Sequence, residues 1–467
     1  MPRYEYSEGT ANKFWEIELT GTKYACKWGR LGGSTSMSSK DCGDAAAAKK
    51  AYDKLIAEKV KKGYALVGGK AAGKGKPMAT PAKASAPAAM RNAELEKAIL
   101  ANPDDPDPYL VYADWLQANG DARGELVVLQ HAGKTKEANA LLKKHGELFI
   151  GPFANKQPET FELEWFCGFI KSATIGWPMF TYDLEGEDGD EDDWGEICKK
   201  ALTEFLKLPS AQFLQDLHLG CVPGEEEMNT SPFAAAINTV KPACLRVLTF
   251  DKTGDWDISS TEASLPDSKA IKGVHTLIIR GGNVSLGKLD LPELREFRVE
   301  SGQLGAHNLK ALATAKWPKI EKLEIWCGDP NYGATGGVKE LAALFAGTGV
   351  PKLVHLGILN CPFADAAVEA LIKSKLLRQL RTLDLRMGNL SDRGIDSMVA
   401  ATDAFSHLDY LDVDDNALTE ASKPKLEGLA KKTNWGTGDR ARQSPARAVP
   451  RADDQNQRWN RYVSVGE

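Results

Sequence analysis

Apolar residues recur beyond residue 210 in the pattern L-x-x-L-x-L, in which most of the intervening positions are polar. The second apolar position of the pattern falls at Leu217, Leu248, Leu277, Phe297, Leu323, Leu356, Leu383 and Leu411. Successive positions are 20 to 33 residues apart. Such a period is typical of a solenoid, in which each unit is too small to bury its own apolar face. We therefore predict that residues 151–436 form a solenoid with parallel β-strands and outer helices.

Helical patterns lie between the predicted strands, for example at 364–374 and 392–401, and asparagines follow strands at Asn360 and Asn416. The best-formed unit covers residues 408–418. These features resemble ribonuclease-inhibitor-like leucine-rich repeats. The resemblance implies a horseshoe whose strands line a broad concave surface suited to protein recognition.

On each predicted strand, the residues between the apolar positions point to the exposed face, because side chains alternate along a strand. Our candidate protein-binding residues on this face are His218, Arg298, Glu324, Trp326, His355, Arg386 and Tyr410. The same face carries Asp216, Glu296, Lys322, Asp384, Asp412 and Asp414. Trp326 is the expected anchor, because Trp, Tyr and Arg dominate interface energetics. The mixture of charges favours a protein partner over a polyanion, and a merely soluble polar surface is the alternative.

The first 67 residues predict a separate small α+β domain. Alternating segments at 14–17 and 24–28 predict two strands, glycines follow at 32–33, and 45–62 predict a basic helix. The tripeptide Trp28-Gly29-Arg30 ends the second strand. This order of elements, with its tripeptide, resembles the WGR domain of DNA-dependent poly(ADP-ribose) polymerases and of many bacterial proteins.

The resemblance implies that Trp28 and Arg30 contact DNA near a strand end, with the indole on a sugar or base and the guanidinium on phosphate. The residue types suit this task, because Arg offers planar donors to phosphate and Trp a wide apolar face. Lys27, Lys49 and Lys50 are expected to add non-specific phosphate contacts. In the alternative interpretation, Trp28 and Arg30 are needed for the packing of the small sheet, and the domain contacts protein.

Between these regions, residues 93–150 predict a short helical domain. The strings Asn102-Pro103-Asp104-Asp105 and Tyr112-Ala113-Asp114-Trp115-Leu116 resemble a bacterial repeat-companion domain, which is typically found beside leucine-rich or other repeats. Asp121 and Arg123 are expected to form a helix cap and an ion pair rather than a site. The alternating apolar and aromatic residues of 161–175 predict a cap on the open end of the solenoid.

The net charge of −5 hides an asymmetry. Residues 1–67 hold 12 basic and 8 acidic residues, and 68–92 add five basic residues and no acid. We predict a flexible basic linker at 68–92, a solvated acidic loop at 183–196 and a mostly disordered tail at 437–467. A basic head on an acidic body suits a polyanion-binding module joined to a part that does not bind polyanions.

The remaining sequence features exclude several classes of function. The sequence has no run of 18 apolar residues, which argues against a membrane span, and its eight cysteines show no CxxC pair, which favours reduced thiols in a cytoplasm. The seven histidines show neither metal-ligand spacing nor a catalytic motif. The polymerase catalytic domain has no counterpart in the chain. We therefore expect no metal, no cofactor and no enzymatic activity.

Two functions remain, and they differ in what the first domain binds. In the first, the chain is a non-enzymatic bacterial adaptor, whose WGR domain binds DNA ends or nicks and whose repeats bind an unknown protein. In the second, it is a protein-interaction scaffold whose WGR domain contacts protein only. An unrecognised enzyme would need polar residues converging in one cleft, and the sequence offers no such set.

Overall fold

The computed structural model describes residues 2–8, 11–30, 35–61, 64–67, 91–154, 161–176, 194–223, 228–251 and 261–436. It divides into two compact units, Met1–Ser85 and Ala86–Glu467. Apart from residues 91–92 and 194–196, the predicted linker and acidic loop lie outside the described residues, as does the whole predicted tail. Among the described helices, none combines the length and the apolar character that crossing a bilayer requires.

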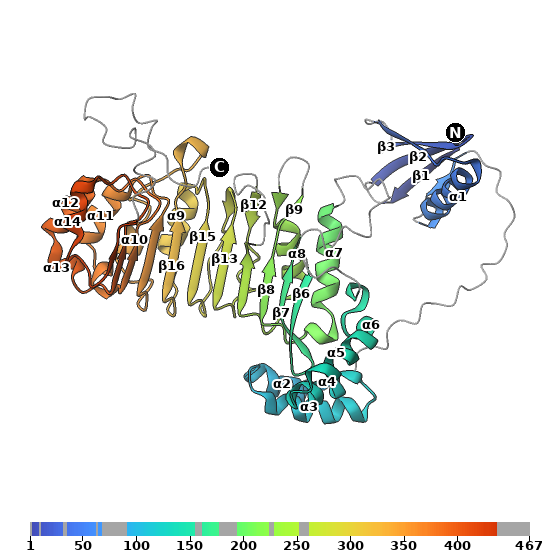
Figure 1. Cartoon of the computed structure of the whole chain (residues 1–467), viewed down its shortest axis with the longest axis horizontal. Helices are drawn as coiled ribbons and strands as arrows, with labels where there is room; N and C mark the ends of the chain where they lie inside the picture. The colour runs from blue at the N-terminus through green and yellow to red at the C-terminus, as the bar shows by residue number, and fades with distance from the viewer. Residues whose placement is uncertain are drawn as a thin grey trace. The chain divides into compact units, whose positions relative to one another are not determined.

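The first unit contains an antiparallel sheet of five strands and one helix (Figure 1). In sheet order the strands are β4 (Thr35–Asp41), β3 (Lys23–Arg30), β2 (Ala11–Thr20), β1 (Arg3–Glu8) and β5 (Ala65–Leu66), and the helix is α1 (Ala45–Lys61). Both predicted strands and the predicted helix are present. Strands β1, β4 and β5 were not predicted, and in β4 the residues TSMSSKD show no apolar alternation.

The core of the first unit lies between the sheet and α1. The register places Trp15 opposite Trp28 and Ile17 opposite Cys26. Trp15, Ile17 and Cys26 are all buried, and apolar residues of α1 pack against them. Alternate residues of β2 and β3 therefore form one apolar face under the helix.

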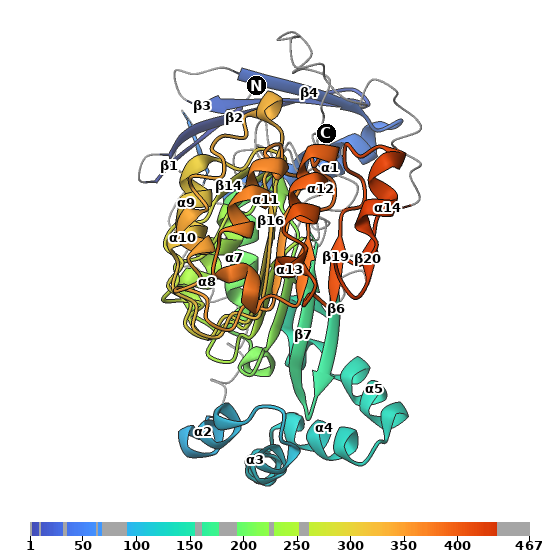
Figure 2. The same ribbon diagram turned by 90° about the vertical axis from the view of Figure 1, so that its left-hand side faces the viewer.

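The second unit is built on a sheet of eleven strands, which we call the repeat sheet (Figures 1 and 2). Its strands are β6 (Phe161–Phe166), β7 (Phe169–Ile175), β8 (Asp216–Leu219), β11 (Val247–Phe250), β13 (Thr276–Arg280), β15 (Glu296–Glu300), β16 (Lys322–Trp326), β17 (His355–Leu359), β18 (Thr382–Asp384), β19 (Tyr410–Asp412) and β20 (Thr433–Asn434). Strands β6 and β7 form an antiparallel hairpin at one edge, and every neighbouring pair from β7 to β20 is parallel. The hairpin thus occupies the edge where the sequence predicts a cap.

Helices cover one face of the repeat sheet, and we call the opposite face the open face (Figure 2). The helices of this part are α7 (Trp194–Leu206), α8 (Ser231–Val240), α9 (Ala306–Thr314), α10 (Ala342–Phe345), α11 (Ala364–Ile372), α12 (Asp392–Ala400), α13 (Thr402–Phe405) and α14 (Lys423–Leu426). Four short strands form a second small sheet: β9 (Val222–Pro223), β10 (Met228–Asn229), β12 (Thr261–Ser264) and β14 (Asn283–Ser285).

The eight apolar template positions lie side by side in the repeat sheet. Each pairs with the next, from Leu217 opposite Leu248 to Leu383 opposite Leu411. All eight side chains are 0% exposed and belong to one continuous core under the helices. The predicted alignment is confirmed, including that of the short unit at Phe297, because a slip of one residue would turn every template side chain to the open face.

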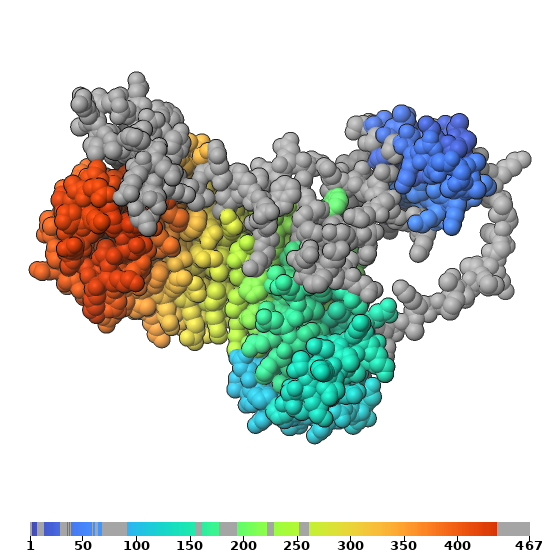
Figure 3. Space-filling model, in the orientation of Figure 1, coloured from blue at the N-terminus to red at the C-terminus, as the bar shows by residue number. Residues whose placement is uncertain are grey.

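The helical segment consists of α2 (Ala93–Ala101), α3 (Pro106–Ala118), α4 (Ala122–His131), α5 (Thr135–Lys144) and α6 (Gly146–Ile150). It packs on the β6–β7 hairpin and on the segment before β8, where Tyr109 and Tyr112 meet Phe169 of β7 and Phe213. In the space-filling view this segment, coloured cyan to teal, stands at the β6 end of the repeat sheet (Figure 3). The side chain of Asp121 accepts from the Arg123 amide at 2.9 Å and pairs with its guanidinium, which confirms the predicted cap and ion pair.

Candidate binding surfaces

Trp28 lies at the margin of the core of the first unit. It is half-buried and packs against the buried cluster of Tyr4, Trp15, Ile17 and Cys26. Only part of the indole is therefore available to a ligand. Arg30 ends β3, where its backbone pairs with Lys13, and its side chain lies outside the described residues.

Lys27 points to the other face of the same sheet, because neighbouring residues alternate along a strand. Its strand partner is Glu16, whose Oε1 lies 3.2 Å from Nη1 of Arg3. The Arg3 guanidinium also lies 4.3 Å from the centroid of the Phe14 ring. The structure therefore does not bring Lys27 and Trp28 to one face, and it adds Arg3, which the sequence analysis did not single out, to the side of Lys27.

Lys49 and Lys50 are exposed on the first half of α1. Nζ of Lys49 lies 3.0 Å from Oδ2 of Asp53, one helical turn away. Both side chains are more than one-third exposed, and an exposed pair of this kind contributes little to stability. The structure thus leaves these two lysines accessible to a phosphate backbone.

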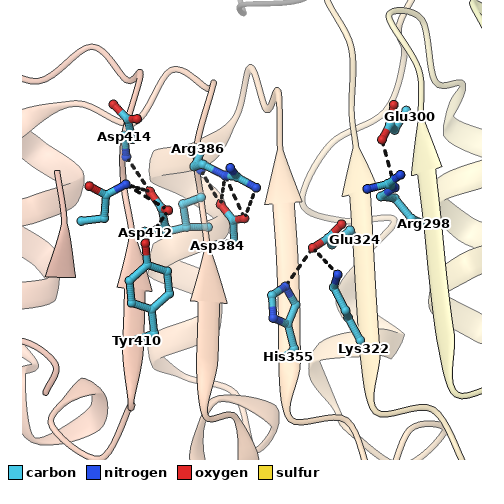
Figure 4. Close-up of polar contacts among 12 residues, drawn as sticks. Arg298, Glu300, Lys322, Glu324, His355, Asp384, Arg386, Tyr410, Asp412 and Asp414 are labelled. Atoms are coloured by element: carbon cyan, nitrogen blue, oxygen red, sulfur yellow. Dashed lines mark hydrogen bonds and ion pairs between the residues drawn. The ribbon is translucent and has the colours of Figure 1, made fainter. Parts of the chain in front are cut away.

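The open face of the repeat sheet carries the other predicted residues in rows that run across the strands. One row contains Asp216, Val247, Thr276, Glu296, Lys322, His355, Thr382 and Tyr410. The next contains His218, Thr249, Ile278, Arg298, Glu324, Gly357, Asp384 and Asp412. The predicted residues lie on this one face, but they interact mainly with one another (Figure 4).

Glu324 is the centre of the most tightly paired group. Its Oε1 lies 3.1 Å from Nε2 of His355 and 3.2 Å from Nζ of Lys322, and Lys322 also reaches Glu296 at 3.0 Å. Burial raises the pKa of Glu324, but its contacts with His355 and Lys322 outweigh burial and lower the pKa to about 2. Glu324 is 6% exposed, so this predicted contact residue is already occupied by its neighbours.

Asp384 and Asp412 form a second group, on β18 and β19. Asp384 accepts from Nε of Arg386 at 3.0 Å, and Asp412 accepts from the Tyr410 hydroxyl at 3.0 Å and from Nδ2 of Asn434 at 3.1 Å. Burial raises the pKa of Asp384, the Arg386 contacts oppose this, and the nearby Asp412 adds to it. Asp384 and Asp412 are 4% and 5% exposed, so two negatively charged groups lie close together and are largely shielded from solvent.

The other predicted residues of the open face are more accessible. Nε of Arg298 lies 2.9 Å from Glu300, and Nδ1 of His218 lies 3.1 Å from Oγ1 of Thr249. Trp326 is half-buried, and its Nε1 is shielded from solvent without a hydrogen-bond partner among the described residues. The indole face of Trp326, rather than its polar edge, is therefore what a partner would contact.

Gly357 is the residue of this face that the sequence analysis missed. It stands between Glu324 and Asp384 in their row. A Cβ at this position would lie 2.4 Å from Cδ1 of Leu359 and 3.0 Å from Cγ of Glu324, both shorter than ordinary contacts. The only signal in the sequence is a glycine at a strand position where the neighbouring repeats carry charged side chains.

Comparison with known proteins bears on the first unit. Residues 3–70 match the family model of the WGR domain. Protein YehF of Escherichia coli (strain K12) is 44% identical over 64 residues, which make up 14% of this chain and 23% of that protein. A crystal structure of a protein from Bacteroides fragilis, 22% identical, covers 93% of this chain and 95% of its own with a TM-score of 0.49. Residues 3–70 of this chain are a WGR domain.

Proposed function

We propose that the protein is a non-enzymatic adaptor whose WGR domain binds DNA ends or breaks and whose repeat sheet binds a protein. The DNA part rests on one observation, the WGR match over residues 3–70 with Trp28-Gly29-Arg30 at the end of β3. The partly exposed indole of Trp28 offers a surface for a sugar or base. The exposed Lys49 and Lys50 of α1 supply cations for the phosphate backbone.

A protein-interaction scaffold is the rival function, and one observation favours it. Trp28 packs against the buried cluster under α1, as expected if the small sheet needs this side chain for its own stability. In the scaffold the WGR domain contacts protein, and its lysines attract DNA weakly and without selectivity. The two functions differ in whether DNA binding depends on the WGR residues themselves.

We further propose that the second unit is a solenoid of ribonuclease-inhibitor-like leucine-rich repeats. The aligned, fully buried template positions and the helices on one face support this assignment. The open face is then the protein-binding surface, with Trp326, Tyr410, Arg298, Arg386 and His218 as its accessible contacts. The eight cysteines show no CxxC pair, which supports a reducing, cytoplasmic location.

The salt dependence of DNA binding tests the proposal. Fluorescence anisotropy of the full chain on a nicked duplex is repeated at salt concentrations between about 50 and 200 mM. Log affinity plotted against log salt concentration is expected to fall with a slope of roughly −0.9 per phosphate contact. The double variant Lys49→Ala/Lys50→Ala is expected to make the slope shallower by up to about 2, with unchanged circular dichroism. An unchanged slope would show that Lys49 and Lys50 do not contact the phosphate backbone, contrary to the proposal.

A photo-reactive amino acid placed on the open face tests the protein part. Introduced at Tyr410, it is expected to cross-link one discrete protein in cells. The same residue at Val399, an exposed position of α12, is the matched control. Equal cross-linking from both positions would mean that the open face is not the specific surface.

A further inference from the structure

Three side chains from three successive strands converge on the open face. Glu324 lies on β16, His355 on β17 and Asp384 on β18, and each offers one ligand atom within 4.8 Å of the other two. We propose that Glu324, His355 and Asp384 bind a divalent transition-metal ion of the zinc class above Gly357. This inference does not depend on the proposed function.

Gly357 makes the convergence possible. It separates Glu324 from Asp384 in the row that crosses the three strands, so a side chain there would stand between the two carboxylates. Glycine leaves that place free, and His355 reaches toward it from two residues earlier on the same strand. A Cβ at Gly357 would lie 3.0 Å from Cγ of Glu324, so even alanine would crowd the Glu324 side chain.

The donor set and its spacing fit zinc better than calcium or magnesium. One imidazole and two carboxylates are ligands that zinc accepts, whereas calcium and magnesium prefer six or more oxygens. Zinc bonds of about 2.0–2.2 Å place neighbouring ligand atoms of a tetrahedron roughly 3.3 Å apart. Nε2 of His355 and Oε1 of Glu324 are already 3.1 Å apart. Rotation of the Asp384 carboxylate would complete a three-residue site, leaving the fourth position to water.

The nitrogen of His355 that faces the carboxylates has no better partner within the described part of the chain. Nε2 is shielded from solvent and pairs with Oε1 of Glu324 at 3.1 Å, so a metal ion would take the place of the proton in that contact. In its neutral form this nitrogen can offer a lone pair to a metal ion. A cation would therefore bind favourably between this shielded ring nitrogen and the two buried carboxylates beside it.

The charges around the cluster determine how strongly it binds. Lys322 lies 3.2 Å from Glu324, and Arg386 lies 2.9 Å from Asp384, so two cations compete with the ion for the two carboxylates. Glu296, paired with Lys322, and Asp412, beside Asp384, add negative charge on either side. Lys322 is therefore the residue whose removal would strengthen metal binding.

Titration of the full chain with Zn²⁺ tests the site. Untagged protein in metal-free buffer is expected to bind one Zn²⁺ per chain at this site by calorimetry, and Co²⁺ bound in its place to show the visible absorption of a tetrahedral site. His355→Ala and Asp384→Asn are each expected to weaken this binding by at least about tenfold. His218→Ala removes another histidine of the open face and is the matched control, with unchanged binding.

A second variant separates a metal site from a purely structural ion-pair group. Lys322→Met removes the competing ammonium beside Glu324, so Zn²⁺ affinity is expected to rise by about tenfold if the cluster is a metal site. If the cluster only holds the strands together, Lys322→Met is expected not to bind Zn²⁺. Failure of the wild-type chain to bind Zn²⁺, or binding that His355→Ala leaves unchanged, would overturn the proposal.

Discussion

Glu324→Gln measures how much the paired group of the open face contributes to stability. Folding lowers the pKa of Glu324 from an ordinary 4.5 to about 2, because its contacts with His355 and Lys322 outweigh the opposing effect of burial. At 1.36 kcal/mol per pH unit this difference amounts to about 3 kcal/mol. Glu324 is 6% exposed, so solvent screening reduces this value little. Since the pKa is lowered by folding, the contribution is complete above about pH 4.5 and is lost as the pH falls toward 2.

Urea unfolding of wild type and Glu324→Gln at pH 7 and pH 3, with chelator present, checks this contribution. The variant is expected to be less stable by up to about 3 kcal/mol at pH 7, and the difference is expected to fall to about half at pH 3. Glu321→Gln is the matched control, since the Glu321 side chain is 54% exposed and lies 3.8 Å from Arg295; its loss is expected to stay below about 0.5 kcal/mol. An equal loss for Glu324→Gln at both pH values would refute the electrostatic reasoning and indicate a packing defect.

Two further predictions concern the framework that holds the open face. Leu356→Ala, at a template position that is 0% exposed, is expected to cost about 2–5 kcal/mol in urea unfolding, whereas Val354→Ala, at a residue 41% exposed, costs under about 1 kcal/mol; equal losses would contradict the assigned register. Gly168→Ala is expected to lower the melting temperature, because its φ is +77° and the new Cβ would lie 2.5 Å from Cγ2 of Val127. Gly287→Ala is the control, because Gly287 has a φ of +59° and an added Cβ would have nothing within 4 Å; it adds only backbone strain of about 1 kcal/mol. An equal effect of the two substitutions would show that the Val127 side chain moves away at little cost.

The sequence was sufficient to predict the repeat sheet. Template positions such as Leu217 and Phe297 are apolar and recur once in each unit, and no single unit can bury its own apolar face. In the structure these side chains are fully buried in one aligned row. In the first unit, β2 and β3 were predicted from alternating side chains, as around Trp15, whereas β1 was missed although Tyr4 and Tyr6 alternate with polar residues. Strand β4 escaped because strand formation there follows from pairing with β3, and its own residues carry no such pattern.

The candidate site was predicted less completely, for reasons of distance along the chain. No segment of the sequence shows metal-ligand spacing, so no metal site was predicted. Glu324, His355 and Asp384 meet because the repeat period places residues about 30 positions apart on neighbouring strands. Alternation correctly placed Glu324 on the open face, but it could not show that its neighbours bury it. In the first unit, Lys27 and Trp28 were predicted to contact DNA together because they are neighbours in the sequence. Alternation along β3 instead places them on opposite faces of the sheet.

The preference of the full chain for broken over unbroken DNA tests the central claim most directly. Anisotropy with nicked, blunt-ended and circular duplexes of equal length at one salt concentration, with Arg30→Ala alongside, provides the comparison. Lys40→Ala, at an exposed position of β4, is the matched control. We predict tighter binding to nicked and blunt-ended DNA than to the circle, a preference that disappears in Arg30→Ala and persists in Lys40→Ala. Equal, weak binding to all three duplexes, unchanged in Arg30→Ala, would contradict DNA-end recognition and favour the protein-interaction scaffold.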